Sequence, residues 1–291
     1  MLRISDPTAS LNFYQTQMGM TLLDRIDFND FNFSLYFLAS MEEPYALTPG
    51  STEAHKFLWS FEGTTLELTH NHLETGACHP SNEEGDGFGH VAFHVDDVYA
   101  TVGELEKEKV EFKKLPDAGR MKGLAFAYDA DRYWVEIIKR SAGHSLTTKA
   151  NLSQTMLRVK DPTKSVPFYE ALGMTLLQEL HFGPDSGAFS LFFLACLKPG
   201  EAPPPFSDVA AMKVFVNSRH LPVLELTHNH GTESDAEFKH FNGNEEGKQG
   251  FGHIGYLVDD VEAAVEDVRT MGYGVHKESS GGMMKGLAFV K

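Results

Sequence analysis

The heptapeptide LELTHNH occupies residues 66–72 and recurs without change at residues 224–230. Chance does not repeat seven residues in this way, so the chain carries two copies of one unit. Further segments repeat in the same order in both halves: GMTLL at 19–23 and 173–177, FSLYFLA at 33–39 and FSLFFLA at 189–195, GFGH at 87–90 and 250–253, and MKGLAF at 121–126 and 284–289. Two copies indicate paired domains, because a solenoid needs three or more repeats.

The pattern within each copy predicts an α+β fold. An aspartate cap followed by proline predicts a helix over residues 6–18, and residues 96–109 form a second helical pattern. Alternating or β-branched stretches predict strands, at 33–39, 55–62, 64–71, 90–95, 124–131 and 133–140. Each domain then consists of paired βαβββ modules that form curved mixed sheets.

The domain boundaries follow from the repeat. We expect domain 1 at residues 1–140, a polar linker without periodicity at 141–151, and domain 2 at 152–291, with the C-terminal strands of domain 2 missing. The proline-rich stretch 198–206 predicts a loop inserted in the second copy.

Composition excludes several classes of protein. Hydrophobic residues are 42% and charged residues 23% of the chain, as in soluble globular proteins. There is no apolar run of about 18 to 20 residues for a membrane span, and no secretory pattern at the N-terminus. The two cysteines fit a reducing cytosol, so we predict a cytoplasmic location. The net charge of −16 makes nucleic acid and membranes poor partners.

Three kinds of polar residue could carry chemistry. Glu67 and Glu225 lie at the same place in the repeated heptapeptide, and surface glutamates have no reason to stay in step. His90 and His253 follow the repeated GFG, although a histidine there is most often a satisfied core or surface residue. Glu136 is flanked by apolar residues, and burial would raise its pKa and make it a candidate base.

The repeated HNH motif offers a rival metal site. His70 and His72 share a face of the predicted strand, as do His228 and His230, and two imidazoles on one face can hold a metal ion. Two more ligands would still be needed. His90 and His94 also share a face, but the second copy has leucine in place of His94.

The joint order of QTMLRVKDPTKSVPFYEALGMTLL, FSLFFLA, LELTHN, GFGHIG, MKGLAF and DADRYWVEI resembles glyoxalase I, the lactoylglutathione lyase family of the vicinal oxygen chelate superfamily. The resemblance covers nearly the whole chain, twice over. It implies one divalent metal, with zinc preferred and nickel or cobalt as alternatives, held by glutamine, glutamate, histidine and glutamate. It also implies that each site joins the front half of one domain to the back half of the other.

Carried onto this chain, the resemblance assigns one complete ligand set, namely Gln154, Glu225, His90 and Glu136. The other site retains only Glu67 and His253, because the counterparts of Gln154 and Glu136 lie beyond the two ends of the sequence. We therefore expect one working site per chain. The alternative, that the sequence is a fragment of a protein with two sites, stays open.

The implied reaction converts the hemithioacetal of methylglyoxal and glutathione into S-lactoylglutathione through an enediolate, which detoxifies methylglyoxal. Glu136 is the main candidate for the base, and Glu225 could serve the opposite stereoisomer. The resemblance assigns substrate binding to Arg158, Asn229, Arg120, Met121 and Lys122. We expect a monomer with its site between the two domains.

One departure from the family concerns the thiol. Relatives of the human type have arginine before GFGH, where this chain has Asp86 in the first copy and Gln249 in the second. An acid at that position should repel a glutathione carboxylate, so a less anionic or cationic conjugate such as trypanothione becomes conceivable. Alternatively, Arg120 or Lys122 compensates.

Two other functions of the same superfamily are alternatives. A metal-dependent dioxygenase would need histidine at the position of Gln154. A non-catalytic protein that sequesters small molecules would have no use for Glu136. Substitution of Glu136 by glutamine separates the second alternative from the lyase.

Overall fold

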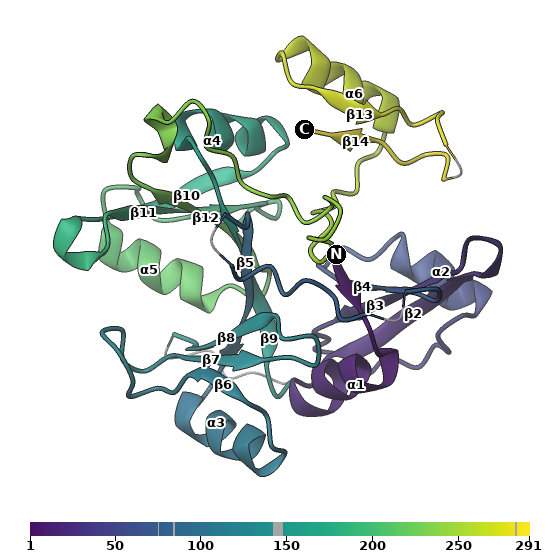
Figure 1. Cartoon of the computed structure of the whole chain (residues 1–291), viewed down its shortest axis with the longest axis horizontal. Helices are drawn as coiled ribbons and strands as arrows, with labels where there is room; N and C mark the ends of the chain where they lie inside the picture. The colour runs from purple at the N-terminus through teal and green to yellow at the C-terminus, as the bar shows by residue number, and fades with distance from the viewer. Residues whose placement is uncertain (75, 84, 142–147, 283) are drawn as a thin grey trace.

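An eight-stranded sheet that takes strands from both repeats is the central element of the computed structural model (Figure 1). The structure describes residues 1–74, 76–83, 85–141, 148–282 and 284–291. In spatial order the strands of this sheet are β10 (Thr175–Phe182), β11 (Phe189–Ala195), β12 (Val223–Asn229), β9 (Asn151–Arg158), β5 (Phe88–Val95), β8 (Trp134–Lys139), β7 (Ala125–Tyr128) and β6 (Phe112–Lys114). The back half of the first copy and the front half of the second therefore form one continuous sheet.

A four-stranded sheet is built from the front half of the first copy alone. Its order is β1 (Leu2–Ile4), β4 (Leu66–Asn71), β3 (Phe33–Ala39) and β2 (Thr21–Phe28). The same order and directions recur in β9, β12, β11 and β10, because β1 and β9 both pair parallel to the strand that carries LELTHN. The two front halves are thus the same unit, as the repeat predicts.

The helices begin where the sequence provides caps. They are α1 (Pro7–Leu11), which continues as a π-helical turn at Asn12–Gln17, α2 (Thr52–Leu58), α3 (Val98–Lys107), α4 (Pro162–Ala171), α5 (Val209–Ser218) and α6 (Val261–Thr270). The Asp6 carboxylate accepts the N–H of Thr8 at 2.8 Å, and Asp161 accepts that of Thr163 at 3.0 Å, so both copies of the DPT motif start a helix in the same way. Short 3₁₀ turns lie at Asn29–Phe31, Pro184–Ser186 and Thr232–Ser234.

The back half of the second copy is arranged differently from that of the first. Residues 252–258 correspond to β5 in sequence but form no strand. The two-stranded sheet β13 (Val275–Lys277) and β14 (Phe289–Val290) lies with α6 away from the large sheet (Figure 1). The N-terminus lies beside the start of residues 252–258, where the Leu2 backbone forms a bridge with Phe251.

The predicted α+β class is confirmed, but one predicted strand is wrong. Residues 55–62 were expected to be a strand, whereas Thr52–Leu58 form α2. Ala54 and Leu58 are both buried, which is the spacing of one helix face, and the Ser51 hydroxyl accepts the N–H of Ala54 at 3.1 Å as the N-cap. The aromatic content of this stretch outweighed its helical period in the sequence-based prediction.

The predicted linker is shorter at its C-terminal end than expected, since β9 already begins at Asn151. Residues 142–147 of that linker lie outside the described residues. The predicted loop at 198–206 contains no helix or strand. The boundaries between the two domains otherwise stay a prediction.

A buried polar cluster joins the start of the chain to the turn before β8. The Tyr14 hydroxyl donates to Asp129 Oδ2 at 2.7 Å, and Asp129 Oδ1 accepts the N–H groups of Asp131 and Tyr133 at 3.0 and 2.9 Å. Asp131 in turn accepts the N–H of Ser5 at 2.9 Å. Burial raises the pKa of Asp129 to about 7, and the nearby Asp131 carboxylate adds to this effect.

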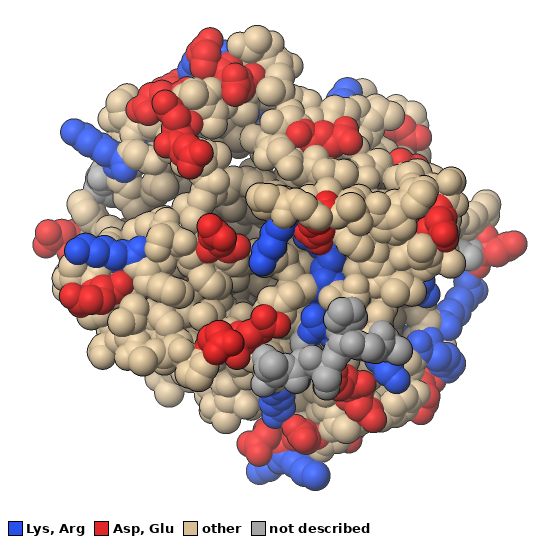
Figure 2. Space-filling model, turned by 180° about the vertical axis from the view of Figure 1, so that it is seen from behind, with Lys and Arg blue, Asp and Glu red and all other residues tan. Residues whose placement is uncertain are grey.

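Acidic side chains are scattered over the face seen in Figure 2, with lysine and arginine side chains among them. Within the described residues, none of the helices combines the length and the apolar character that crossing a bilayer requires.

Candidate metal centre

Four polar residues meet on four adjacent strands in the middle of the eight-stranded sheet. Glu225 lies on β12, Gln154 on β9, His90 on β5 and Glu136 on β8. In the register of the sheet, Gln154 is opposite Ala92, and Ala92 is opposite Glu136. His90 is two residues from Ala92, and Glu225 is two residues from Val223, the other neighbour of Gln154. Since side chains two residues apart share a face, all four project from one face of the sheet.

The four side chains are in mutual contact. Gln154 Nε2 is 3.0 Å from His90 Nε2, 3.3 Å from Glu136 Oε2 and 2.5 Å from Glu225 Oε2. His90 Nε2 lies 3.2 Å from Glu136 Oε2. The sequence placed these residues in two different domains, and the structure brings them together at the seam between the repeats.

All four residues are buried, with exposed fractions of 5 to 7%. Burial raises the pKa of Glu225 to about 7, while the neighbouring His90 acts in the opposite direction. Burial alone would lower the pKa of His90, but the hydrogen bond and charge of Glu136 raise it above the ordinary value for histidine. Two carboxylates and an imidazole in a buried space form a strongly coupled group that favours a bound cation.

Two neighbours that the sequence-based prediction did not assign to the site orient these ligands. The Thr227 hydroxyl donates to Glu225 Oε1 at 3.1 Å, which directs the other carboxylate oxygen toward Gln154. The ring of Phe126 packs edge-on against the imidazole of His90, with centroids 5.3 Å apart. The repeat indicates the contact between Thr227 and Glu225, because Thr69 makes the same hydrogen bond to Glu67 in the first copy.

Arg158 and Asn229, predicted to bind the thiol, lie at the ends of β9 and β12. Arg158 is half-buried, and its Nη1 donates to the carbonyls of Phe88 at 2.7 Å and Asp86 at 3.2 Å. Burial lowers the pKa of this guanidinium relative to its ordinary value, and the nearby acids oppose the effect. Asn229 is exposed, two residues beyond Thr227 on the same face of the strand.

Arg120, Met121 and Lys122 lie on the exposed loop between β6 and β7. Arg120 donates to the carbonyl of Asp185, which is in the turn between β10 and β11 of the second repeat. Lys122 instead donates to the carbonyl of Asp117 in its own loop. This loop therefore reaches across the seam, and among the described residues none of its three side chains is bonded to the four buried ligands.

The carboxylate of Asp86, expected to repel a thiol carboxylate, is buried in a turn. It accepts from His79 Nε2 and from the N–H of Glu83, both at 2.8 Å. These two donors offset its charge locally. Residues His79, Glu83 and Asp86 could themselves hold a metal ion by spacing, but Glu83 is paired with Lys248 at 2.6 Å.

The second pair predicted from the repeat also comes together. Glu67 Oε2 lies 3.5 Å from His253 Nε2, and both side chains are more exposed than the four-residue set. Among the described residues, no glutamine and no second glutamate is bonded to this pair.

The HNH motifs do not form a metal site in the described part of the chain. His72 contacts the Ser34 hydroxyl at 2.9 Å, and His230 contacts Ser190 at 2.7 Å. His228 is 2.8 Å from Glu233 Oε2. His72 and His230 therefore contact serines on β3 and β11, and His228 contacts a glutamate of the following 3₁₀ turn, so the rival site predicted from spacing is not supported.

The structure contains paired βαβββ units. Two carboxylates, an imidazole and an amide are buried between them. These features define a class of proteins in which two repeats share one polar site. A family model supports this: the Glyoxalase/Bleomycin resistance protein/Dioxygenase superfamily matches residues 1–137 and 151–290. The chain belongs to this superfamily.

Relatives that match the whole chain indicate which family within this superfamily the chain resembles. The chain is 37% identical over 304 residues to glyoxalase I of Saccharomyces cerevisiae, a match that covers 100% of this chain and 87% of the yeast protein. It is 36% identical over 302 residues to lactoylglutathione lyase of Schizosaccharomyces pombe, covering 100% and 90% of the two chains. The crystal structure of glyoxalase I from Zea mays matches with a TM-score of 0.62 and 26% identity, covering 95% of this chain and 80% of that one. The predicted resemblance to glyoxalase I is confirmed, and so is the predicted enzyme class.

Proposed function

We propose that this protein converts the hemithioacetal of methylglyoxal and glutathione into S-lactoylglutathione, at a single divalent-metal site formed by Gln154, Glu225, His90 and Glu136. The observation that carries the proposal is the mutual contact of these four buried side chains across the seam of the repeats. The names of the two full-length fungal relatives support the reaction.

The residues present fit a divalent ion. A divalent cation would offset the charge of two buried carboxylates that lie beside a neutral amide. Three oxygen donors and one imidazole nitrogen suit zinc, nickel or cobalt without selecting one of them, and zinc is the ion we prefer. Gln154 would offer its amide oxygen, which requires the amide to turn over from the orientation in which its nitrogen meets Glu225.

A divalent ion held there would stabilise negative charge that develops on the substrate oxygens, by several kcal/mol. The protein's own residues supply the proton transfer. We assign to the Glu136 carboxylate the removal of a proton from one carbon and its return to the adjacent carbon, a role worth about 100- to 10,000-fold. Glu225, on the opposite side of the group, would serve the other stereoisomer. Its position beside Thr227 keeps one oxygen directed into the site.

We assign the glutathione part of the substrate to the polar residues around this group. Arg158 offers a half-buried guanidinium, and a planar fork of donors suits a carboxylate. Asn229 follows on the adjacent strand, and the loop with Arg120, Met121 and Lys122 reaches over from the first repeat. The two hydrogen bonds to the Asp86 carboxylate offset its charge locally, which weakens the objection to an anionic thiol such as glutathione.

The decisive experiment compares Glu136→Gln with the unaltered protein. We expect the formation of S-lactoylglutathione to fall by about 100-fold or more, because the amide cannot take a proton. Metal content, measured by mass spectrometry, should stay near one ion per chain or fall only in part. The matched control is Glu104→Gln, which alters an exposed glutamate on α3 and should leave turnover unchanged.

Sequestration predicts another outcome. If neither form turns over the hemithioacetal, while both bind it equally well by calorimetry, the protein holds the ligand without converting it. Unchanged turnover in Glu136→Gln would refute the assignment of the base.

A further inference from the structure

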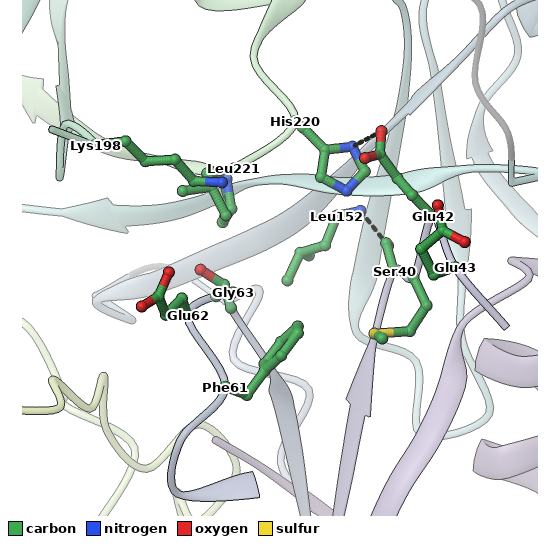
Figure 3. Close-up of a pocket in the computed structure, with 13 residues that line it drawn as sticks. Ser40, Glu42, Glu43, Phe61, Glu62, Gly63, Leu152, Lys198, His220 and Leu221 are labelled. Atoms are coloured by element: carbon green, nitrogen blue, oxygen red, sulfur yellow. Dashed lines mark hydrogen bonds and ion pairs between the residues drawn. The ribbon is translucent and has the colours of Figure 1, made fainter. Parts of the chain in front are cut away.

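A cavity of about 300 Å³ lies where the two repeats meet, apart from the four-residue group. Figure 3 shows the side chains around it. Its lining comes from residues 40–43 and 61–64 of the first repeat, and from Leu152, Lys198 and residues 220–222 of the second. A volume of this size is at the lower end of the range, about 300 to 1,000 Å³, that accommodates small molecules.

The two repeats contribute corresponding positions to this cavity, but with different side chains. In the alignment set by LELTHNH, Glu62 corresponds to His220, and in the alignment set by the FSL segments, Glu42 corresponds to Lys198. Two acids in the first repeat have thus become two bases in the second. The cavity therefore combines carboxylates with an ammonium group, which neither repeat would provide alone.

The charged groups are distributed over two ends of the cavity. Glu42 and Glu43 lie with His220 at one end, and Lys198 lies with Glu62 at the other (Figure 3). His220 Nδ1 is 3.5 Å from Glu42 Oε1. In the part of the chain that the structure describes, no ion pair involves Glu43 or Lys198. One end thus has two carboxylates beside His220, and the other has the ammonium group of Lys198 together with the carboxylate of Glu62.

The rest of the lining is uncharged. Phe61, Leu221 and Pro222 contribute apolar surface. The N–H of Leu152 donates to the Ser40 hydroxyl at 3.0 Å, which fixes the two repeats against each other at this point. A ligand with a short apolar middle and two charged ends would match this arrangement.

We propose that the cavity binds a small zwitterion of the amino acid or short peptide class. Its ammonium group would lie toward Glu42 and Glu43, and its carboxylate toward Lys198. Because these side chains are solvent-exposed, each ion pair contributes little, and we expect a dissociation constant on the order of 1 mM.

The test uses three probes of equal length with different charges: ε-aminocaproate, which is a zwitterion, hexamethylenediamine, which is a dication, and adipate, which is a dianion. Binding is measured by ligand-observed NMR titration on the full chain. We expect ε-aminocaproate to bind, and each of the other probes to bind at least about threefold more weakly.

The variants Glu43→Gln and Lys198→Gln should each weaken the binding of ε-aminocaproate by about threefold. Lys198→Gln should also remove the discrimination against hexamethylenediamine, because it removes the like charge that repels the second ammonium group. The matched controls, Glu53→Gln and Lys213→Gln, change exposed residues that do not line the cavity and should bind like the unaltered protein.

Four results would overturn the proposal. Tighter binding of hexamethylenediamine than of ε-aminocaproate would identify a site for polycations, and tighter binding of adipate a site for dianions. A failure of ε-aminocaproate to bind, or equal binding in all four variants, would show that the cavity does not recognise zwitterions.

Discussion

The buried carboxyl of Asp129 leads to a quantitative prediction about stability. The pKa of Asp129 is raised from 3.8 to about 7, chiefly by burial. Between these two values the folded protein keeps a proton that the unfolded chain has lost, so stability falls as pH rises. Above about pH 7 both states are ionised, and the full cost of the buried charge remains. At about 1.4 kcal/mol per pH unit, the interval between the two pKa values corresponds to a decrease of about 4 kcal/mol in the free energy of unfolding.

Replacement of Asp129 by asparagine removes this titration. The neutral amide can still accept the N–H groups of Asp131 and Tyr133 through its oxygen, and its NH₂ group can donate to the Tyr14 hydroxyl. We therefore expect the variant to gain stability relative to the unaltered protein by about 3 kcal/mol between about pH 5 and about pH 8.

The assay is urea denaturation of both proteins across this pH range, with the free energy of unfolding extrapolated to water. Only the difference between the two proteins matters, because other groups titrate in both. The control is Asp30→Asn, which changes an exposed aspartate. Its difference in unfolding free energy from the unaltered protein should not change with pH. A difference for Asp129→Asn that stays constant with pH, or that favours the unaltered protein more as pH rises, would refute the reasoning.

The remaining predictions concern the site and the helices. Glu136→Gln should lose turnover by about 100-fold or more, whereas Glu67→Gln should keep most of it, and equal losses in kinetic assays would contradict a single site. Arg158→Lys should raise KM by about tenfold with little change in kcat, because an ammonium cannot replace the planar fork; a fall in kcat alone would speak against this role. Ser51→Ala should destabilise the protein by about 1 kcal/mol in urea denaturation, through loss of the α2 cap. Chelation of the metal should lower Tm, and added zinc should restore it; an unchanged Tm would argue against a tightly bound ion.

The repeat made the fold of the front halves predictable. Nearly identical segments predict equivalent strands, and β3 and β11 occupy equivalent places beside β4 and β12. Glu225 and Thr227 are two residues apart on one strand, and their hydrogen bond shows that they share a face. The helix α2 was missed because its aromatic residues fit a strand equally well, and only the buried Ala54 and Leu58 reveal the helical period.

Other features could not be read from one sequence because they depend on tertiary partners. The sequence indicates an acid at Asp86 but not that its carboxylate is held by His79 and a backbone N–H. Similarly, residues 252–258 occupy the place of β5 in the repeat, yet they form no strand. A strand depends on its neighbours for hydrogen bonds, so corresponding segments of two repeats can have different structures.

The position of β9 explains why the site needs both repeats. This strand pairs parallel to β12 on one side and antiparallel to β5 on the other, so Gln154 lies between residues of the two copies. A slip of β9 by one residue would turn Gln154 to the opposite face and remove its contacts with His90, Glu136 and Glu225 together. The bulge between Ala92 and Phe93 lies in this pairing and fixes the register beside the site. The proposed chemistry would therefore depend on the register of one strand across the seam, and substitutions that disturb this pairing should impair all four proposed ligands rather than a single contact.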